Sequence, residues 1–202
     1  MEIEFSKGKI EIEKDLNELD KLTIDFTSIL TKLKIRYVLI SGYISILFGR
    51  SRSSPDIDVI IEKLSFPEFQ KLWKELCRCF ECINTTNAED AYNNYLAKDA
   101  RINFPRKGNV LPYMEVKFPT TELEKWALTE KIRVSLSGNE IFISPLELQI
   151  SYKLFLGRKG NEKDIEDARH LYKLFSDKLD MKLLEEFNKK LKVVDMFNKY
   201  IR

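Results

Sequence analysis

Three acidic residues on two short, strand-like segments have the types and spacing of a divalent-metal site. The segments read DIDVII at residues 56–61 and YMEVKF at residues 113–118. Because successive side chains of a strand point to opposite faces, Asp56 and Asp58 share one face, with Cα atoms about 6.6 Å apart. Glu115 alternates with apolar neighbours in the same way and is available as a third ligand. Oxygen ligands of this kind hold Mg²⁺ or Mn²⁺, and such ions assist phosphoryl or nucleotidyl transfer.

A small turn lies shortly before these acids. Ser41 and Gly42 separate an apolar, strand-like segment at residues 37–40 from a short helical segment at residues 43–48. Free backbone N–H groups at the start of a helix can hold a phosphate, and a glycine lets the ligand come close to the backbone. The sequence therefore predicts a phosphate-binding turn beside the metal site.

The same acids also allow a purely structural interpretation. Asp56 and Asp58 would then end an exposed strand and form surface ion pairs with Arg50 and Arg52. Acidic residues at strand ends are common without any metal, so residue types and spacing alone leave both interpretations open.

The elements that must position these residues follow from hydrophobic periodicity and turn residues. Helices are expected over residues 16–33, 43–48, 66–80, 145–156, 163–175 and 181–199. Strands are expected over residues 37–40, 56–61, 95–104 and 113–118, with a hairpin at residues 131–143. This order predicts an α+β fold, in which helices flank a mixed β-sheet and a helical lobe follows. We expect residues 1–143 to form the core, and residues 144–202 to form a C-terminal helical region packed on it.

The composition is typical of a globular protein. The chain has 202 residues, of which 44% are hydrophobic and 33% charged, and its formal net charge is +2. This small charge gives no strong reason for a nucleic-acid partner, although basic residues gather at 98–107 and 189–192. Free thiols are expected at Cys77, Cys79 and Cys82. No apolar run could span a membrane and the N-terminus does not read as a secretory signal, so we expect a cytoplasmic protein.

The segment from residue 37 to residue 58 resembles the nucleotidyltransferase superfamily that includes DNA polymerase β. It is most similar to the small prokaryotic members related to the AbiEii toxins. In these, an apolar strand, a Gly-Gly or Gly-Ser turn, a short helix and a frequent arginine precede Asp-x-Asp. The matching residues here are Ser41, Gly42, Arg52, Ser54, Asp56 and Asp58. Glu115 falls where the family has its third acid, whereas Ser41 departs from the family's glycine.

A second block, residues 144–175, resembles two helices of the toxin-related proteins. In that pattern a lysine lies on one helix with an arginine at its end, and Lys-Asp and a further Asp lie on the next. The matching residues, which the resemblance assigns to nucleotide binding, are Lys153, Arg158, Lys163, Asp164 and Asp167. By this resemblance, Lys153 and Arg158 contact nucleotide phosphates, while the two aspartates organise the far wall of the cleft.

Helical spacing independently predicts that these aspartates point inward. Asp164, Asp167, Leu171 and Leu174 occur at i, i+3, i+7 and i+10, which places them on one helix face. Polar groups that point inward need partners, and Lys153 and Arg158 are the candidates. A structural salt bridge between two helices is the alternative to a nucleotide-binding role.

The resemblance implies an enzyme that transfers a nucleoside monophosphate from a nucleoside triphosphate to an acceptor hydroxyl, with Mg²⁺ or Mn²⁺ as cofactor. Asp56 and Asp58 would hold the metal and the triphosphate. Glu115 would ligate a second ion or act as a base, and Ser41 and Gly42 would bind phosphates. The acceptor would be an RNA or tRNA end, as expected for a toxin, or a small hydroxylated molecule.

Other functions are compatible with the same fold. The chain could be a catalytically inactive nucleotide-binding module, or a toxin–antitoxin interaction module whose partner is a cognate antitoxin or a second copy. Residues 92–106 raise a similar choice. Their aromatic residues, Tyr92, Tyr95 and Phe104, would either stack on single-stranded RNA or pack in the core.

Overall fold

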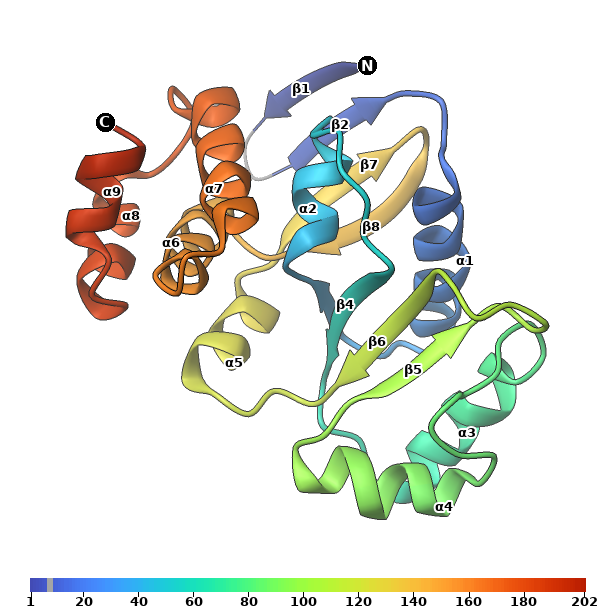
Figure 1. Cartoon of the computed structure of the whole chain (residues 1–202). Helices are drawn as coiled ribbons and strands as arrows, with labels where there is room; N and C mark the ends of the chain where they lie inside the picture. The colour runs from blue at the N-terminus through green and yellow to red at the C-terminus, as the bar shows by residue number, and fades with distance from the viewer. Residues whose placement is uncertain (7–8) are drawn as a thin grey trace.

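The computed structural model describes residues 1–6 and 9–202, and within them eight strands form one mixed sheet (Figure 1). The strands are β1 (Glu2–Ser6), β2 (Lys9–Glu13), β3 (Tyr37–Leu39), β4 (Asp56–Ile61), β5 (Ile102–Pro105), β6 (Tyr113–Lys117), β7 (Ile132–Leu136) and β8 (Asn139–Ile143). Across the sheet their order is β1-β2-β7-β8-β3-β4-β6-β5. β4 runs antiparallel to β3 and parallel to β6. The predicted mixed sheet is confirmed.

Helices lie around this sheet. They are α1 (Glu18–Lys32), α2 (Gly42–Leu47), α3 (Phe66–Leu76), α4 (Ala88–Asp90), α5 (Glu122–Thr129), α6 (Leu146–Gly157), α7 (Glu162–Phe175), α8 (Met181–Lys190) and α9 (Val194–Tyr200). A π-helical turn, Ala91–Tyr95, and a 3₁₀ turn, Leu96–Lys98, follow α4. Among the residues described, no helix has the length and apolar character needed to cross a bilayer.

Side-chain caps decide where two of the long helices begin. Asn17 accepts a hydrogen bond from the backbone N–H of Asp20, whose carboxylate accepts one from the N–H of Asn17. Ser65 and Glu68 form the same reciprocal arrangement before α3. Each capping box satisfies N–H groups that the first helical turn leaves free. This explains why α1 starts at residue 18 and not at residue 16, as periodicity alone predicts.

The two faces of the central strands pack against different helices. Ile57, Val59 and Ile61 of β4 belong to the main core, which also contains Phe26 of α1 and Leu72 of α3. The opposite face of the sheet packs against α5, α6 and α8, where Val38 and Ile60 form a second buried cluster with residues of these helices. By strand alternation, Asp56 and Asp58 lie on the Ile60 face. The acids therefore face α5 and α6.

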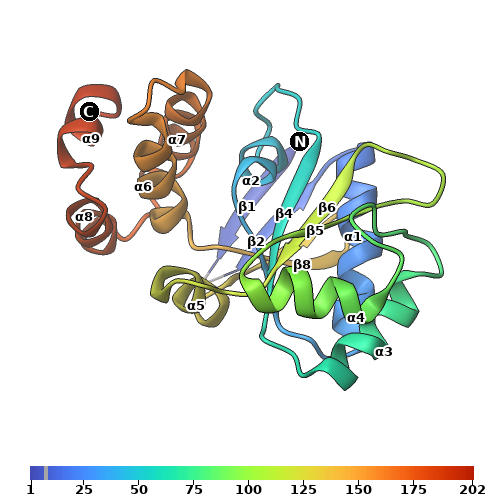
Figure 2. The same ribbon diagram turned by 60° about the horizontal axis from the view of Figure 1, so that its bottom comes forward.

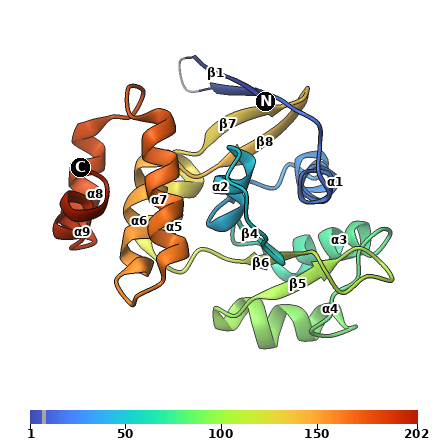
Figure 3. The ribbon, with the colours of Figure 1, turned by 45° about the horizontal axis from the view of Figure 1, so that its top comes forward.

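Helices α6 to α9 form one group at a side of the molecule in all the ribbon views (Figure 1, Figure 2 and Figure 3). α6 packs against α7 and α8. Phe175 of α7 meets Phe48, the residue that ends α2, edge-on with ring centroids 4.7 Å apart. The predicted C-terminal helical lobe is confirmed, whereas a domain boundary at residue 143 stays a prediction.

The predicted strand over residues 95–104 is wrong over residues 95–101. Residues 91–98 are helical, and the strand begins only at Ile102. Asn87 starts this helical segment by accepting hydrogen bonds from the N–H groups of Glu89 and Asp90. Ala91 and Leu96 are then buried on its inner side. Phe104 is fully buried in the main core, so it is not available to stack on RNA.

Three further features of the fold differ from those predicted. The helix expected over residues 181–199 is two helices, because Lys192 adopts a left-handed backbone with φ of 56° between them. The helix expected to reach residue 80 ends at Leu76, since Phe80 forms a β-bridge with Arg106. The N-terminal pair β1 and β2 was not predicted, and β2 lies parallel to β7 with Ile10 and Ile12 fully buried. The three cysteines are free, as predicted.

Candidate active site

The parallel pairing of β4 with β6 brings the three predicted metal ligands together. Asp58 lies directly opposite Glu115, and Asp56 opposite Tyr113. One carboxylate oxygen from each of Asp56, Asp58 and Glu115 lies within 4.8 Å of the other two. Ser54, which the family resemblance also assigned to the site, donates a hydrogen bond of 3.1 Å to Asp56. We call Asp56, Asp58 and Glu115 the acid triad.

The acid triad fits a hard divalent cation. Its donors are all carboxylate oxygens, which suit Mg²⁺ and Mn²⁺ better than softer transition metals. The side chains of Asp58 and Glu115 are only 17% and 13% exposed, so their mutual repulsion is weakly screened. The predicted alternative, in which Arg50 and Arg52 neutralise these aspartates, is not what the structure shows, because both arginines pair with Asp167.

Arg101 also contacts the acid triad. Its Nη1 lies 2.5 Å from Oε1 of Glu115 and 4.0 Å from Oδ1 of Asp58. The sequence placed Arg101 in a basic segment and not in the site. Its position follows from the antiparallel pairing of β5 with β6, in which Asn103 faces Glu115, so that the residue two positions earlier lies diagonally across from the glutamate. This pairing is not visible in the local sequence.

Glu115 has a raised affinity for a proton. Burial, and after it the hydrogen bond and charge of Asp58, together raise the pKa of this carboxyl from its ordinary value of 4.5 to about 7, against the opposing charge of Arg101. A carboxyl of this kind changes charge near neutral pH. It is therefore suited to accept a proton from a substrate at that pH.

This pKa predicts how stability depends on pH in the absence of metal. Between pH 4.5 and about pH 7 the folded protein binds more protons at Glu115 than the unfolded chain does. The free energy of unfolding at this site therefore falls as the pH rises through that window and is level above it. Urea unfolding of wild type and Glu115→Gln across this range should show the variant gaining relative stability as the pH rises.

The control for that series is Glu130→Gln, which changes an exposed glutamate at the end of α5. Its difference from wild type should stay constant with pH. If the stability of Glu115→Gln relative to wild type stays constant or falls as the pH rises, the raised pKa is contradicted.

The turn before α2 has an unusual backbone. Ser41 has φ of 67° and ψ of −135°, a conformation that glycine adopts far more readily than serine. The next residue, Gly42, lies under the guanidinium of Arg52, and a Cβ atom at Gly42 would collide with Nη2 of that arginine. Gly42 is thus needed for the close approach of Arg52, whereas Ser41 occupies a position that favours glycine.

Replacing Ser41 with glycine is expected to stabilise the protein by about 1 kcal/mol, because relief of the backbone strain exceeds the entropy that a glycine adds to the unfolded chain. Urea unfolding measures this gain. Ser28→Gly, at an exposed position of α1, is the matched control and should cost about 0.5–1 kcal/mol. A loss of similar size in Ser41→Gly would show that the turn is not strained.

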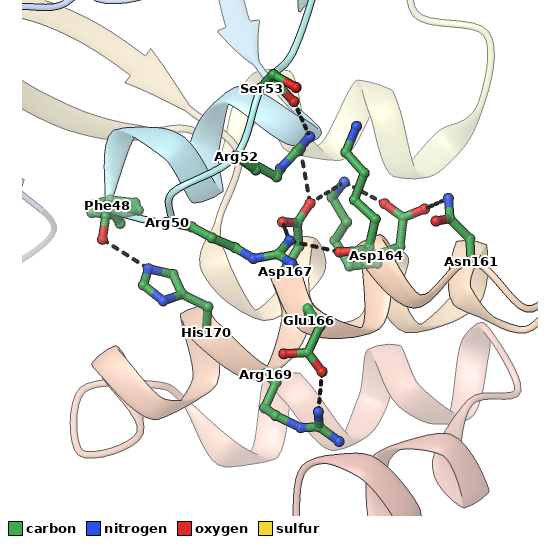
Figure 4. A network of polar contacts seen from close by, with 12 residues as sticks. Phe48, Arg50, Arg52, Ser53, Asn161, Asp164, Glu166, Asp167, Arg169 and His170 are labelled. Atoms are coloured by element: carbon green, nitrogen blue, oxygen red, sulfur yellow. Dashed lines mark hydrogen bonds and ion pairs between the residues drawn. The ribbon is translucent and has the colours of Figure 1, made fainter.

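A second polar cluster connects the loop after α2 with α6 and α7. The buried carboxylate of Asp167 accepts hydrogen bonds from Arg50 and Arg52, the latter at 3.0 Å (Figure 4). Lys153 of α6 lies 2.9 Å from Asp167 and 2.6 Å from Asp164. We call these five residues the charge cluster. It brings together four residues predicted for nucleotide binding, and it also has the contacts of the structural salt bridge that was the alternative.

Other predicted residues lie outside both groups. The guanidinium of Arg158 rests on the ring of Phe155 at 4.2 Å and donates to the backbone oxygen of Lys192. The side chain of Lys163 is exposed, and its backbone oxygen accepts a hydrogen bond from Arg50. Leu174, predicted on the inward stripe of α7, is 40% exposed, so that stripe ends at Leu171.

Tyr152 of α6 is close enough to Asp58 of the acid triad and to Asp164 of the charge cluster for both charges to act on its hydroxyl, although the sequence did not single it out. Burial raises the pKa of its hydroxyl, and the negative charges of Glu124, Asp58 and Asp164 raise it further. Its ring is partly exposed and nearly parallel to that of Phe155, with centroids 5.8 Å apart. No local signal distinguishes this tyrosine from the aromatic residues of the core.

The fold and the acid-lined face define a protein with a nucleotidyltransferase-like fold. The chain resembles the crystal structure of an antigenic nucleotidyltransferase-like protein from Paracoccidioides brasiliensis, with a TM-score of 0.56 and 14% identity over 91% of this chain and 92% of that one. It also resembles the solution structure of the antibiotic-resistance factor ANT(2'')-Ia, with a TM-score of 0.55 and 11% identity over 91% and 97% of the two chains.

Sequence comparison adds no closer relative. No protein-family model matches the chain, and neither does any curated protein. At the identities found, the two structures establish a common fold. Membership of the group related to the AbiEii toxins stays a prediction.

Proposed function

We propose that this protein is a metal-dependent nucleotidyltransferase, which transfers a nucleoside monophosphate from a nucleoside triphosphate to an acceptor hydroxyl and releases pyrophosphate. The observation that carries the proposal is the acid triad. Three carboxylates from two paired strands converge on the Ile60 face of a nucleotidyltransferase-like sheet. Three carboxylates placed this close together repel one another, and this repulsion destabilises the fold unless a cation offsets it. The arrangement therefore favours a cation-binding site.

Each acid has a role in this mechanism. Asp56 and Asp58 would hold Mg²⁺ or Mn²⁺, and the hydrogen bond from the Ser54 hydroxyl would fix the orientation of Asp56. The bound ion would offset the negative charge of the triphosphate and of the leaving pyrophosphate. Glu115 either shares in holding an ion or accepts the proton of the attacking hydroxyl at its carboxylate oxygen, for which its pKa of about 7 is suited.

The nucleotide would lie between the acid triad and the charge cluster. The turn at Ser41 and Gly42 and the guanidinium of Arg52 above it offer donors to phosphate oxygens. The partly exposed ring of Tyr152 offers a face for the base. Of the basic residues predicted for nucleotide binding on α6 and α7, Arg158 and Lys163 are exposed, whereas Lys153 already binds two aspartates.

The acceptor is proposed as either of two classes. An RNA or tRNA end is what a toxin-like member would modify. A small hydroxylated molecule is favoured by the likeness to an antibiotic-resistance factor. A cognate antitoxin and a second copy of the chain are also proposed as partners, and only the family resemblance supports them.

A second candidate is a nucleotide-binding module that has lost turnover. Two observations favour it: Ser41 occupies a glycine-like conformation, and Arg101 already binds an acid of the triad. Either feature would slow transfer while leaving the fold intact.

The deciding experiment incubates the purified protein with Mg²⁺ and each of the four nucleoside triphosphates, labelled on the α-phosphate. Total RNA and, separately, small hydroxylated compounds serve as acceptors. Transfer of the label that stops when EDTA is added supports the proposal. Triphosphates labelled on the γ-phosphate are the matched control and should transfer nothing, because that phosphate leaves in pyrophosphate. Absence of transfer, together with nucleotide binding that ignores Mg²⁺ in calorimetry, would favour the inactive module.

A further inference from the structure

The acid triad carries its own positive charge. Nη1 of Arg101 lies 2.5 Å from Oε1 of Glu115 and 4.0 Å from Oδ1 of Asp58. Among residues 1–6 and 9–202, Arg101 is the one basic residue within 4.0 Å of these carboxylates. Its guanidinium is therefore the group that partly neutralises three clustered acids in the metal-free protein.

The backbone holds Arg101 in this position, but the side chain is free to leave. The residue directly precedes β5, the edge strand of the sheet, and the pairing of Asn103 with Glu115 fixes its distance from the triad. Its side chain is 52% exposed, in contrast to the 13% of Glu115. The guanidinium can therefore turn into solvent without breaking the packing of the core.

A divalent ion and this guanidinium need the same carboxylate. The carboxylate of Glu115 accepts the hydrogen bond of Arg101 through Oε1, and a cation held by the triad would draw on the same carboxylate. Two positive groups within a few ångströms of each other repel. The triad therefore binds one of them more weakly when the other is in place.

We propose that Arg101 is a displaceable counter-ion of the acid triad, which stabilises the metal-free protein and competes with the divalent ion for Glu115 and Asp58. The inference rests on the proposed metal site. Arg101, which is not itself a metal ligand, then sets the affinity of the acid triad for the ion. Metal entry releases the guanidinium toward solvent at the mouth of the site.

The test is calorimetric titration of Mn²⁺ into the nucleotide-free protein. Arg101→Gln should bind Mn²⁺ roughly five- to tenfold more tightly than wild type, since the competing charge is gone. Arg101→Lys keeps the charge and should stay within about twofold of wild type. The matched control is Arg36→Gln, which removes an exposed arginine paired with Glu62 at 2.8 Å, at the opposite end of β4.

Thermal unfolding supplies a second measurement that does not depend on activity. Without metal, Arg101→Gln should melt about 2–4 °C below wild type, because three acids are left without a counter-ion. Saturating Mn²⁺ should remove this difference. A merely structural arginine would lower the melting temperature equally with and without the ion.

The outcomes separate this inference from the proposed function. If Arg101→Gln and wild type bind Mn²⁺ equally, or the variant binds it more weakly, Arg101 is not a competitor, although the metal site stands. If no variant binds Mn²⁺ while all melt as folded proteins, both the inference and the metal site fail. If the variant keeps wild-type Mn²⁺ affinity but loses affinity for a nucleoside triphosphate, Arg101 is a phosphate ligand instead.

Discussion

Asp58→Asn is expected to reduce nucleotide transfer by roughly a thousandfold or more while leaving the protein folded. Asparagine keeps the shape of the side chain but loses the negative charge that, in the proposed mechanism, would hold a divalent ion. Asp58 is placed centrally in the acid triad, since it pairs with Glu115 across the strands and shares its strand face with Asp56. The measurement is the rate of label transfer from the α-labelled triphosphate, with Mn²⁺ affinity determined in parallel.

The stability of this variant separates chemistry from folding. Removing one of three like charges relieves repulsion, so Asp58→Asn should melt at or above the wild-type temperature without metal. Asp25→Asn is the matched control: it removes an exposed carboxylate that pairs with Arg106 at 2.5 Å, and it should leave transfer unchanged. Transfer that survives in Asp58→Asn would place the chemistry outside the acid triad.

The grouping of the acid triad could be predicted because it depends mostly on the local sequence of β4. Alternation along β4 puts Asp56 and Asp58 on one face, and that depends only on the strand being a strand. Glu115 required one more step, since its distance from Asp58 depends on the parallel register of β4 with β6. The resemblance to the family pattern predicted Glu115 as the third acid without knowledge of this register.

Other parts of the site depend on contacts between distant segments. Arg101 contacts the triad because of the register between β5 and β6. It lies just after the helical residues 91–98, part of which was predicted as strand because it contains strand-forming residues. The structural alternative paired Arg50 and Arg52 with Asp56 and Asp58, yet both arginines pair with Asp167, more than one hundred residues away in sequence. Long, flexible basic side chains have several partners within reach, and local sequence does not choose between them.

The N-terminal strands show a different limit. The alternating residues of β2 were a strand signal, with Ile10 and Ile12 on the face that proves fully buried. A short alternating segment still needs a partner to form a stable strand, and here the partner is β7, over one hundred residues later. Prediction of β2 therefore required knowledge of its pairing with β7, which hydrophobic periodicity does not reveal.

Lys153→Met is expected to destabilise the protein by about 3–5 kcal/mol, the largest loss predicted for a change outside the hydrophobic core. The ammonium of Lys153 is 3% exposed and lies 2.6 Å from Asp164 and 2.9 Å from Asp167, which are 9% and 0% exposed. Methionine fills a similar volume but leaves Asp164 without a cation, and a buried, uncompensated carboxylate is strongly unfavourable. Urea unfolding at neutral pH measures the loss.

Two variants show whether that loss comes from the buried charge. Lys117→Met breaks a less buried pair with Glu124, at 2.5 Å, and should cost about 1 kcal/mol. Adding Asp164→Asn to Lys153→Met removes the orphaned charge, so the double variant should be more stable than Lys153→Met alone. If Lys153→Met costs no more than Lys117→Met, the lysine is not a structural counter-ion, and the predicted role in phosphate binding becomes the better explanation.

The same cluster links stability to the site. Asp167 holds Arg50 and Arg52, which lie in the loop that leads from α2 into β4, and Lys153 holds Asp167 from the side of α6. Loss of Lys153 should therefore loosen the loop directly before Asp56 as well as the packing of α6 on α7. Hydrogen exchange of the Lys153→Met variant should show faster exchange at residues 49–55 than in wild type, whereas Lys117→Met should leave that segment unchanged. Unchanged exchange there would mean that the charge cluster fixes the helices without positioning the strand that carries Asp56 and Asp58.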